Sequence, residues 1–352
     1  MPRIRAFAPV AAFLLALLLA APALAQVEVE GPGAGEGGTV APGLELPAPE
    51  AEPPAADVQL YMPEEDQLIG RLTIPNRSLA TLVQPEGRTW RAFRMETLFW
   101  IAGIVILGTL AALAAFYFWR GTIRIDRGRS DRWVPRFNGL ERFAHWTTAL
   151  SFIALALTGL IVTFGRFLLI PLMGHDAFTA TSEVSKNLHN FSSVPFVLGL
   201  VLMLALWIRD NLPTRADLVW LKHGGGMFSR NASFHPESGR FNAGQKGIFW
   251  AVVLGGIAMT VTGIMLMTPF YVTGVSGMQI AHVVHAILAA LMIAMILGHI
   301  YIGTIGMEGA FDAMGKGEVD ENWAIEHHRG WYEAQRDAGR QPAPGTRPAG
   351  AD

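Results

Sequence analysis

Five of the ten histidines in this 352-residue chain lie within or at the edge of long apolar stretches. They are His145, His189, His282, His285 and His299. An ionisable side chain is costly inside a bilayer, so each is a candidate functional residue. For one isolated histidine, a hydrogen bond between helices explains its position equally well. Several histidines at matched depths would instead favour a shared role, such as binding a metal.

Five apolar stretches could position these histidines, and each meets the length of about 20 residues that crosses the hydrocarbon core. They are residues 97–119, 143–165, 187–208, 247–268 and 279–305. Hydrophobic residues make up 51% of the chain and charged residues only 16%, with a mean hydropathy of +0.33. A soluble protein of this size carries more charge. The sequence therefore predicts an all-α membrane protein with five transmembrane helices.

Composition also excludes several classes of protein. The chain has no cysteine, so it offers no disulfide framework, no ligands for an iron–sulfur cluster and no cysteine nucleophile. Its net charge of −2 excludes a broadly basic nucleic-acid binder.

Basic residues predict the orientation. Seven arginines lie in residues 120–142 and six basic residues in 209–246, against two in 166–186 and none in 269–278. Because loops rich in lysine and arginine stay in the cytoplasm, the first two loops and the tail, residues 306–352, are expected inside. This orientation fits a bacterial inner membrane.

The N-terminal part is predicted to lie outside the cytoplasm. Residues 1–25 combine Arg3 and Arg5 with a short apolar run and a small-residue cleavage pattern, as in a signal peptide. An uncleaved anchor is the alternative. Residues 26–96 then form an external linker and partner-docking segment. Residues 67–92 contain β-prone runs that favour a small strand-bearing patch.

Four of the histidines form two pairs at matched depth. His145 and His299 lie near the cytoplasmic ends of their stretches, and His189 and His285 near the outer ends. His285 and His299 are 14 residues apart, which puts them within ~40° on one helix face and ~21 Å apart in height. His282 lies about 100° from the His299 face, so we expect His285 to be the outer partner.

Two histidine pairs in separate layers suit haem iron. Zinc would need three or four ligands clustered at one depth. The chain has no CxxCH motif, so two non-covalent b haems are expected. Small residues near the histidines could make room for porphyrin, or could simply allow close helix packing. They are Gly159, Gly199, Gly263 and Gly298.

Four short motifs and the histidine spacing resemble the gamma subunit, a cytochrome b, of membrane-bound respiratory formate dehydrogenases. The resemblance covers roughly residues 137–333 and includes all four candidate iron ligands in order. Its long N-terminal part fits the longer variety of that family, with a signal peptide and an extra helix at 97–119. The motifs are Glu141–Trp146, Leu188–Asn190, Phe241–Lys246 and Trp323–Tyr332.

The resemblance implies a four-helix dihaem domain at residues 143–305. It also implies a catalytic molybdenum or tungsten subunit and an Fe–S beta subunit as partners, with menaquinone or ubiquinone as electron acceptor. The expected quinone site near the inner haem comprises Asn242, Gly244, Gln245 and His299. The polar side chains of this set could donate and accept hydrogen bonds. Alternatively, Asn242 and Gln245 merely cap a helix.

Two other functions remain open from the sequence. A cytochrome b anchor subunit of a hydrogenase, or of another quinone-reducing oxidoreductase, would have similar histidine spacing. A transporter with interior histidines is the non-redox alternative, but we find no inverted repeat and no charged residue within a predicted span.

Overall fold

The computed structural model describes residues 68–71, 81–84, 87–226 and 237–339. The predicted signal peptide, residues 1–25, lies outside the described residues. The chain divides into two compact units, one comprising residues 97–164 with 185–352 and the other residues 1–96 with 165–184. In the second unit, β1 (Leu68–Arg71) pairs antiparallel with β2 (Thr81–Gln84). The strands predicted in this segment are confirmed.

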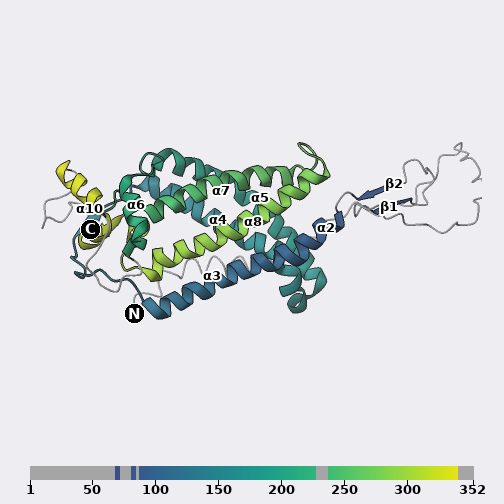
Figure 1. Ribbon diagram of the computed structural model, residues 1–352, viewed down its shortest axis with the longest axis horizontal. Helices are drawn as coiled ribbons and strands as arrows, with labels where there is room; N and C mark the ends of the chain where they lie inside the picture. The colour runs from purple at the N-terminus through teal and green to yellow at the C-terminus, as the bar shows by residue number, and fades with distance from the viewer. Residues whose placement is uncertain (1–67, 72–80, 85–86, 227–236, 340–352) are drawn as a thin grey trace, which may run out of the picture. The chain divides into compact units, whose positions relative to one another are not determined.

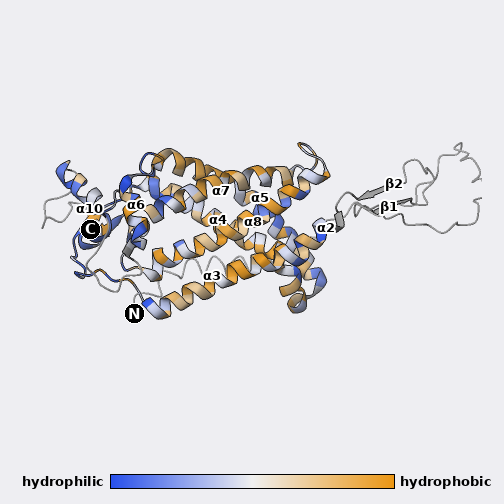
Figure 2. Cartoon of the chain, viewed as in Figure 1, coloured by the Kyte–Doolittle hydropathy of each residue, from blue (hydrophilic) through white to orange (hydrophobic). Residues whose placement is uncertain are grey.

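All five predicted apolar stretches are helical, and each helix is long and apolar enough to cross a membrane (Figures 1 and 2). The first continues from α2 (Gly87–Ala92) through the π-helical turn η2 (Phe93–Leu98) into α3 (Phe99–Arg120). The others are α4 (Gly139–Leu168), α5 (Ile170–Trp207), α7 (Ala243–Met267) and α8 (Val275–Tyr301), the last extended by η4 (Ile302–Gly306). The predicted fold class is confirmed.

All five helices begin before the apolar stretches that hydropathy indicates, and α4 and α5 show this most clearly. α4 begins at Gly139 because Asn138 and Glu141 cap its start reciprocally. The Asn138 N–H donates to Glu141 at 2.9 Å, and the Glu141 N–H donates to Asn138 at 3.0 Å. The expected outer loop at 166–186 is instead largely helical, because α5 starts at Ile170 and bends at Gly174, whose φ of 80° is left-handed.

Helix packing places α8 between two neighbours, with α7 on one side and α3 on the other (Figure 1). Near the end of α3, the Phe116 and Tyr117 rings lie 6.2 and 6.5 Å from the Tyr301 ring. Between α4 and α5, a Cβ added to Gly199 would lie 2.3 Å from Thr148 Oγ1. Gly199 therefore serves close helix packing, which was one of its two predicted roles.

The predicted cytoplasmic loop and tail fold together into one layer, which we call the polar cap and define as residues 121–138 and 307–337. β3 (Trp133–Pro135) pairs antiparallel with β4 (Glu318–Asp320). The short α9 (Asp312–Gly315) and the longer α10 (Glu321–Asp337) flank β4 in sequence. Between α5 and α7 lie α6 (Arg215–Lys222) and the 3-10 turn η3 (Gly224–Gly226).

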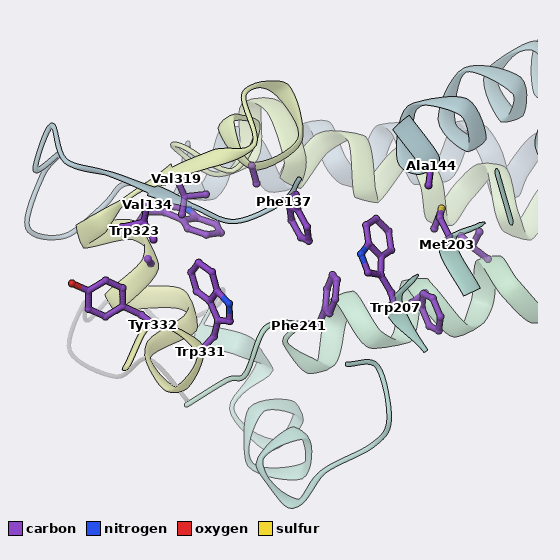
Figure 3. Close-up of a cluster of buried hydrophobic side chains, with 14 of the residues drawn as sticks. Val134, Phe137, Ala144, Met203, Trp207, Phe241, Val319, Trp323, Trp331 and Tyr332 are labelled. Carbon is purple, nitrogen blue, oxygen red and sulfur yellow. The ribbon is translucent and has the colours of Figure 1, made fainter. Parts of the chain in front are cut away.

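Aromatic side chains join the polar cap to the helices (Figure 3). The rings of Phe137, Trp207 and Phe241 lie 5.6 to 5.8 Å apart and are all buried. Trp323 and Trp331 of α10 extend the same buried cluster. The tail motif Trp323–Tyr332 thus contributes core residues that hold the cap on the ends of α4, α5 and α7.

His328 lies at the centre of the cap and is only 1% exposed. Arg136 Nη2 donates to its Nε2 at 3.0 Å, because a guanidinium can only donate. The other ring nitrogen, Nδ1, therefore carries the proton and donates to the Gly239 carbonyl at 2.9 Å. Burial and the nearby Arg136 and His327 hold the pKa of His328 well below its usual range. Burial and the nearby Arg240 lower the pKa of Arg136 to about 9, so Arg136 stays charged at neutral pH.

This arrangement predicts that the cap loses stability in acid. Unfolded histidine takes up a proton near pH 6.5 whereas buried His328 does not, so stability is full above pH 6.5 and falls below it, by at most about 1.4 kcal/mol per pH unit. Hydrogen exchange of α10 amides between pH 7.5 and 5 measures this slope. His328→Gln should flatten this slope, whereas His327→Gln should change it only slightly, because burial is the largest cause of the lowered pKa of His328. An equal slope in wild type and His328→Gln would show that another group is responsible.

Candidate functional site

The structure brings together His145 of α4 and His299 of α8, which we call the inner pair. Their ring centres lie 6.2 Å apart and their planes meet at 60°. The start of α4 is anchored beside this pair, since Trp146 Nε1 donates to the Met314 carbonyl at 2.9 Å and Arg142 Nε to the same oxygen at 3.1 Å. The inner pair therefore lies next to the polar cap.

His189 of α5 and His285 of α8 form a second pair, which we call the outer pair. Their ring centres lie 6.4 Å apart and their planes meet at 58°. α8 is an uninterrupted helix from Val275 to Tyr301, so the helical arithmetic that separates the two pairs by ~21 Å applies to it. The structure places His285 opposite His189, as the spacing predicts.

Both pairs have a spacing that fits a metal ion between two imidazoles. A metal–imidazole bond is about 2 Å long, so two opposed ligands place their nitrogens about 4 Å apart and their ring centres about 6 Å apart. Within the described part of the chain, no group of three or more His, Cys, Asp or Glu residues could hold a metal ion. A porphyrin would supply the remaining ligands to an iron held by two histidines. The donor set therefore fits two b haems.

The outer pair has neighbours that the sequence analysis missed. Thr158 Oγ1 lies 3.0 Å from His189 Nδ1, and Thr262 Oγ1 lies 2.9 Å from His285 Nδ1. Each threonine is followed by one of the predicted small residues, Gly159 or Gly263. The recurrence of a Thr-Gly dipeptide at the outer ends of two predicted spans is a signal that could have pointed to them.

Gly159, Gly263 and Gly298 differ in whether a side chain at their position would contact a histidine. A Cβ added to Gly159 would lie 3.4 Å from His189 Cε1, and one added to Gly263 would lie 3.6 Å from His285 Cε1. A Cβ added to Gly298 would have no neighbour within 4 Å. Gly159 and Gly263 thus border the outer histidines directly, and Gly298 borders open space.

Asn242 and Gln245 form a capping box at the start of α7. The Gln245 N–H donates to Asn242 Oδ1 at 2.9 Å, and the Asn242 N–H donates to Gln245 Oε1 at 3.0 Å. The cap uses both amide oxygens and neither amide NH₂ group. A Cβ added to Gly244 would lie 2.8 Å from the Trp220 ring, so the indole of α6 packs on that glycine. The capping alternative is therefore present, and any quinone contact would be additional to it.

Lys246 fixes the same end of α7 to α6. Its Nζ donates to Asp217 Oδ2 at 2.8 Å and to the Leu212 carbonyl at 3.0 Å. Partial burial would raise the pKa of Asp217, but the hydrogen bonds from Lys246 and Thr214 outweigh it and lower that pKa. Asp217 is thus held ionised opposite a buried lysine, which keeps the Phe241–Lys246 motif in place.

Comparison with known proteins gives consistent matches. The family model described as prokaryotic cytochrome b561 matches residues 136–317. The cytochrome b556(fdo) subunit of formate dehydrogenase from Escherichia coli K12 is 31% identical over 209 residues, which cover 58% of this chain and 93% of that protein. The nitrate-inducible cytochrome b556(Fdn) subunit of the same strain is 26% identical, over 57% of this chain and 91% of that protein.

A third relative is the formate dehydrogenase cytochrome b556 subunit of Haemophilus influenzae, which is 25% identical over 58% of this chain and 84% of that protein. The family match contains all four paired histidines, but it ends before α10 and begins after α3.

Proposed function

Because this chain belongs to the prokaryotic cytochrome b561 family of helical membrane proteins, we propose that it is the cytochrome b subunit of a membrane-bound formate dehydrogenase. The observation that carries the proposal is the two histidine pairs, with ring centres 6.2 and 6.4 Å apart. Relatives at 31% and 26% identity are named as formate dehydrogenase cytochrome b556 subunits. The proposed partners are a catalytic molybdenum or tungsten subunit and an Fe–S beta subunit.

In this proposal each histidine pair holds one b haem, which supplies a one-electron iron couple. The outer pair would hold the haem that accepts electrons from the Fe–S subunit outside the cytoplasm, and the inner pair would hold the haem that passes them to menaquinone or ubiquinone. The arginine-rich loop at 120–142 supports this orientation in the inner membrane. An electron moving inward works against about 2.3 kcal/mol per 100 mV of membrane potential, so the reaction would conserve energy.

A spectrum of the purified complex tests the function. Formate should reduce two b-haem components, seen in a reduced-minus-oxidised difference spectrum, and the co-purifying large subunit should be a formate dehydrogenase. Reduction by hydrogen but not by formate would instead identify the hydrogenase-type alternative. A complex without b haem would overturn the cytochrome function altogether.

We also propose that Asn242, Gly244, Gln245 and His299 contact the quinone. Support comes from the capping geometry, which leaves the two amide NH₂ groups outside the capping bonds at the end of α7. Both groups could donate to a quinone carbonyl. His299 belongs to the inner pair, so a quinone there would have an electron donor beside it.

Variants that keep the cap separate the two roles of Asn242 and Gln245. Asn242→Ser retains a good N-cap oxygen, and Gln245→Glu retains the oxygen that accepts the Asn242 N–H, but both remove the amide NH₂ group. In the double variant, formate should still reduce both haems while quinol formation slows at least tenfold. Stopped-flow haem reduction and quinone reduction measure the two steps. Undiminished quinone reduction with normal inhibitor sensitivity would remove both residues from the site.

A further inference from the structure

The two histidines of the outer pair contact threonines in the same way. Thr158 of α4 lies 3.0 Å from Nδ1 of His189 on α5, and Thr262 of α7 lies 2.9 Å from Nδ1 of His285 on α8. Each contact joins a helix to its successor in the chain. The same threonine–histidine contact therefore occurs twice, between two different pairs of helices.

The hydroxyl protons show which group donates. Thr158 Oγ1 donates to the Ala154 carbonyl at 2.6 Å, and Thr262 Oγ1 donates to the Ala258 carbonyl at 2.8 Å. A hydroxyl has one proton, so each threonine oxygen is left to accept from the histidine. The Nδ1 atoms therefore carry the protons, and each Nε2 presents its lone pair to a metal.

The inner pair differs from this arrangement. His145 Nδ1 is buried and has no hydrogen-bond partner within the described part of the chain. The hydroxyl of Thr148, three residues further along α4, donates to the Ala144 carbonyl at 2.8 Å and packs against Gly199 of α5. Thus Nδ1 of each outer histidine has an accepting threonine oxygen, whereas Nδ1 of His145 has no acceptor among the described residues.

We propose that Thr158 and Thr262 are positioning residues that lower the reduction potential of the outer haem relative to the inner one. An acceptor on the outer nitrogen of a ligating imidazole raises its basicity. A more basic ligand favours the ferric state, because that state carries the extra positive charge. Electrons would then move from the outer to the inner haem with a favourable difference in potential, which offsets part of the membrane potential. This inference rests on the proposed dihaem function.

Valine substitutions test the proposal, because valine keeps the shape of threonine and removes the accepting oxygen. Redox titration of the purified complex, followed by optical and electron paramagnetic resonance spectra, should show the outer component shifted to higher potential in Thr158→Val/Thr262→Val. We expect the ferrous-to-ferric ratio of that haem to rise about tenfold at a fixed potential, equal to ~59 mV for one electron. The inner component should stay unchanged, and Thr→Ser at both positions should restore the wild-type value.

Thr260→Val is the matched control. Thr260 lies two residues before Thr262 on α7, and its hydroxyl donates to the Gly256 carbonyl at 2.7 Å, so the variant loses the same backbone bond. It should leave both potentials unchanged. If the double variant fails to assemble, the same titration is made on Thr158→Val and Thr262→Val separately.

The possible failures are distinguishable. Two haem components in wild type with unshifted potentials in the valine variants would overturn this inference and leave the proposed function standing. An equal shift of both components, or the same shift in Thr260→Val, would also overturn it. A wild-type complex lacking two b-haem components would overturn the proposed function and this inference with it.

Discussion

Replacing His285 by alanine is expected to remove the outer b-haem signal and leave the inner one. The imidazole of His285 faces that of His189 with ring centres 6.4 Å apart, and a haem that keeps only one of these two ligands would be bound weakly. His145 and His299 are ~21 Å further along and should keep their haem. Difference spectra and haem extraction from the purified complex would show one haem in place of two.

His282→Ala is the matched control, because it removes the same side chain one turn earlier on α8. It should retain both haems, since His282 lies about 60° around the helix from His285 and about 100° from His299, and it is His285 whose ring faces that of His189. Loss of a haem in His282→Ala together with two haems in His285→Ala would show that the pairing is wrong. His299→Ala should give the opposite pattern, with loss of the inner haem.

The histidine pairs could be predicted because two simple regularities hold. α8 is continuous from Val275 to Tyr301, so a spacing of 14 residues fixes both the face and the height difference of His285 and His299. The basic loops give the direction of each helix, so His145 and His189 could be assigned to opposite sides. Neither regularity gives the distance between rings on different helices, because that depends on how the helices pack.

The polar cap could not be predicted from local pattern. β3 has three residues, and its partner β4 follows more than 180 positions later, with Trp133 opposite Asp320. No periodicity in so short a segment specifies such a partner. The tail motif was found through resemblance alone, and the structure gives its residues a physical role: Trp323 is 3% exposed, and His328 accepts a hydrogen bond from Arg136.

Asn242 and Gln245 show a different limit of sequence reasoning. Residues that cap a helix and residues that bind a carbonyl compound are the same types, because both tasks need donors and acceptors on short side chains. The sequence left the two roles open. The structure supplies the capping bonds, so only a variant that preserves those bonds can isolate a role in quinone reduction.

We expect the ion pair between Arg240 and Glu141 to stabilise the start of α4, next to the polar cap, more than an exposed ion pair would. Arg240 Nη2 donates to Glu141 Oε1 at 2.6 Å, and the carboxylate also accepts from Trp207 Nε1 at 2.9 Å. The Glu141 side chain is only 6% exposed. Arg240→Met removes the guanidinium that contacts this carboxylate. Removal of one partner from a fully buried pair costs about 3–5 kcal/mol; because Arg240 is 25% exposed and Arg136 also interacts with Glu141, we expect a cost of about 3 kcal/mol or less.

The stability lost in Arg240→Met should weaken the binding of the inner haem more than that of the outer one. Glu141 caps the first turn of α4, and His145 follows one turn later, so loosening of that turn should release the inner haem at a lower temperature. Thermal denaturation of the detergent-solubilised complex, followed by haem absorbance, should show this order in Arg240→Met. Adding Glu141→Gln should recover part of the stability, because the buried group is then neutral.

Arg129→Met provides the comparison for an exposed pair. The Arg129 side chain is 41% exposed and lies 3.5 Å from Glu308, so solvent screens the interaction and its loss should cost less than about 1 kcal/mol. If Arg240→Met lowers the unfolding temperature no more than Arg129→Met does, the buried pair does not hold the start of α4. A lower unfolding temperature with simultaneous loss of both haems would instead mean that this ion pair stabilises the whole bundle, and that His145 has no special dependence on Glu141.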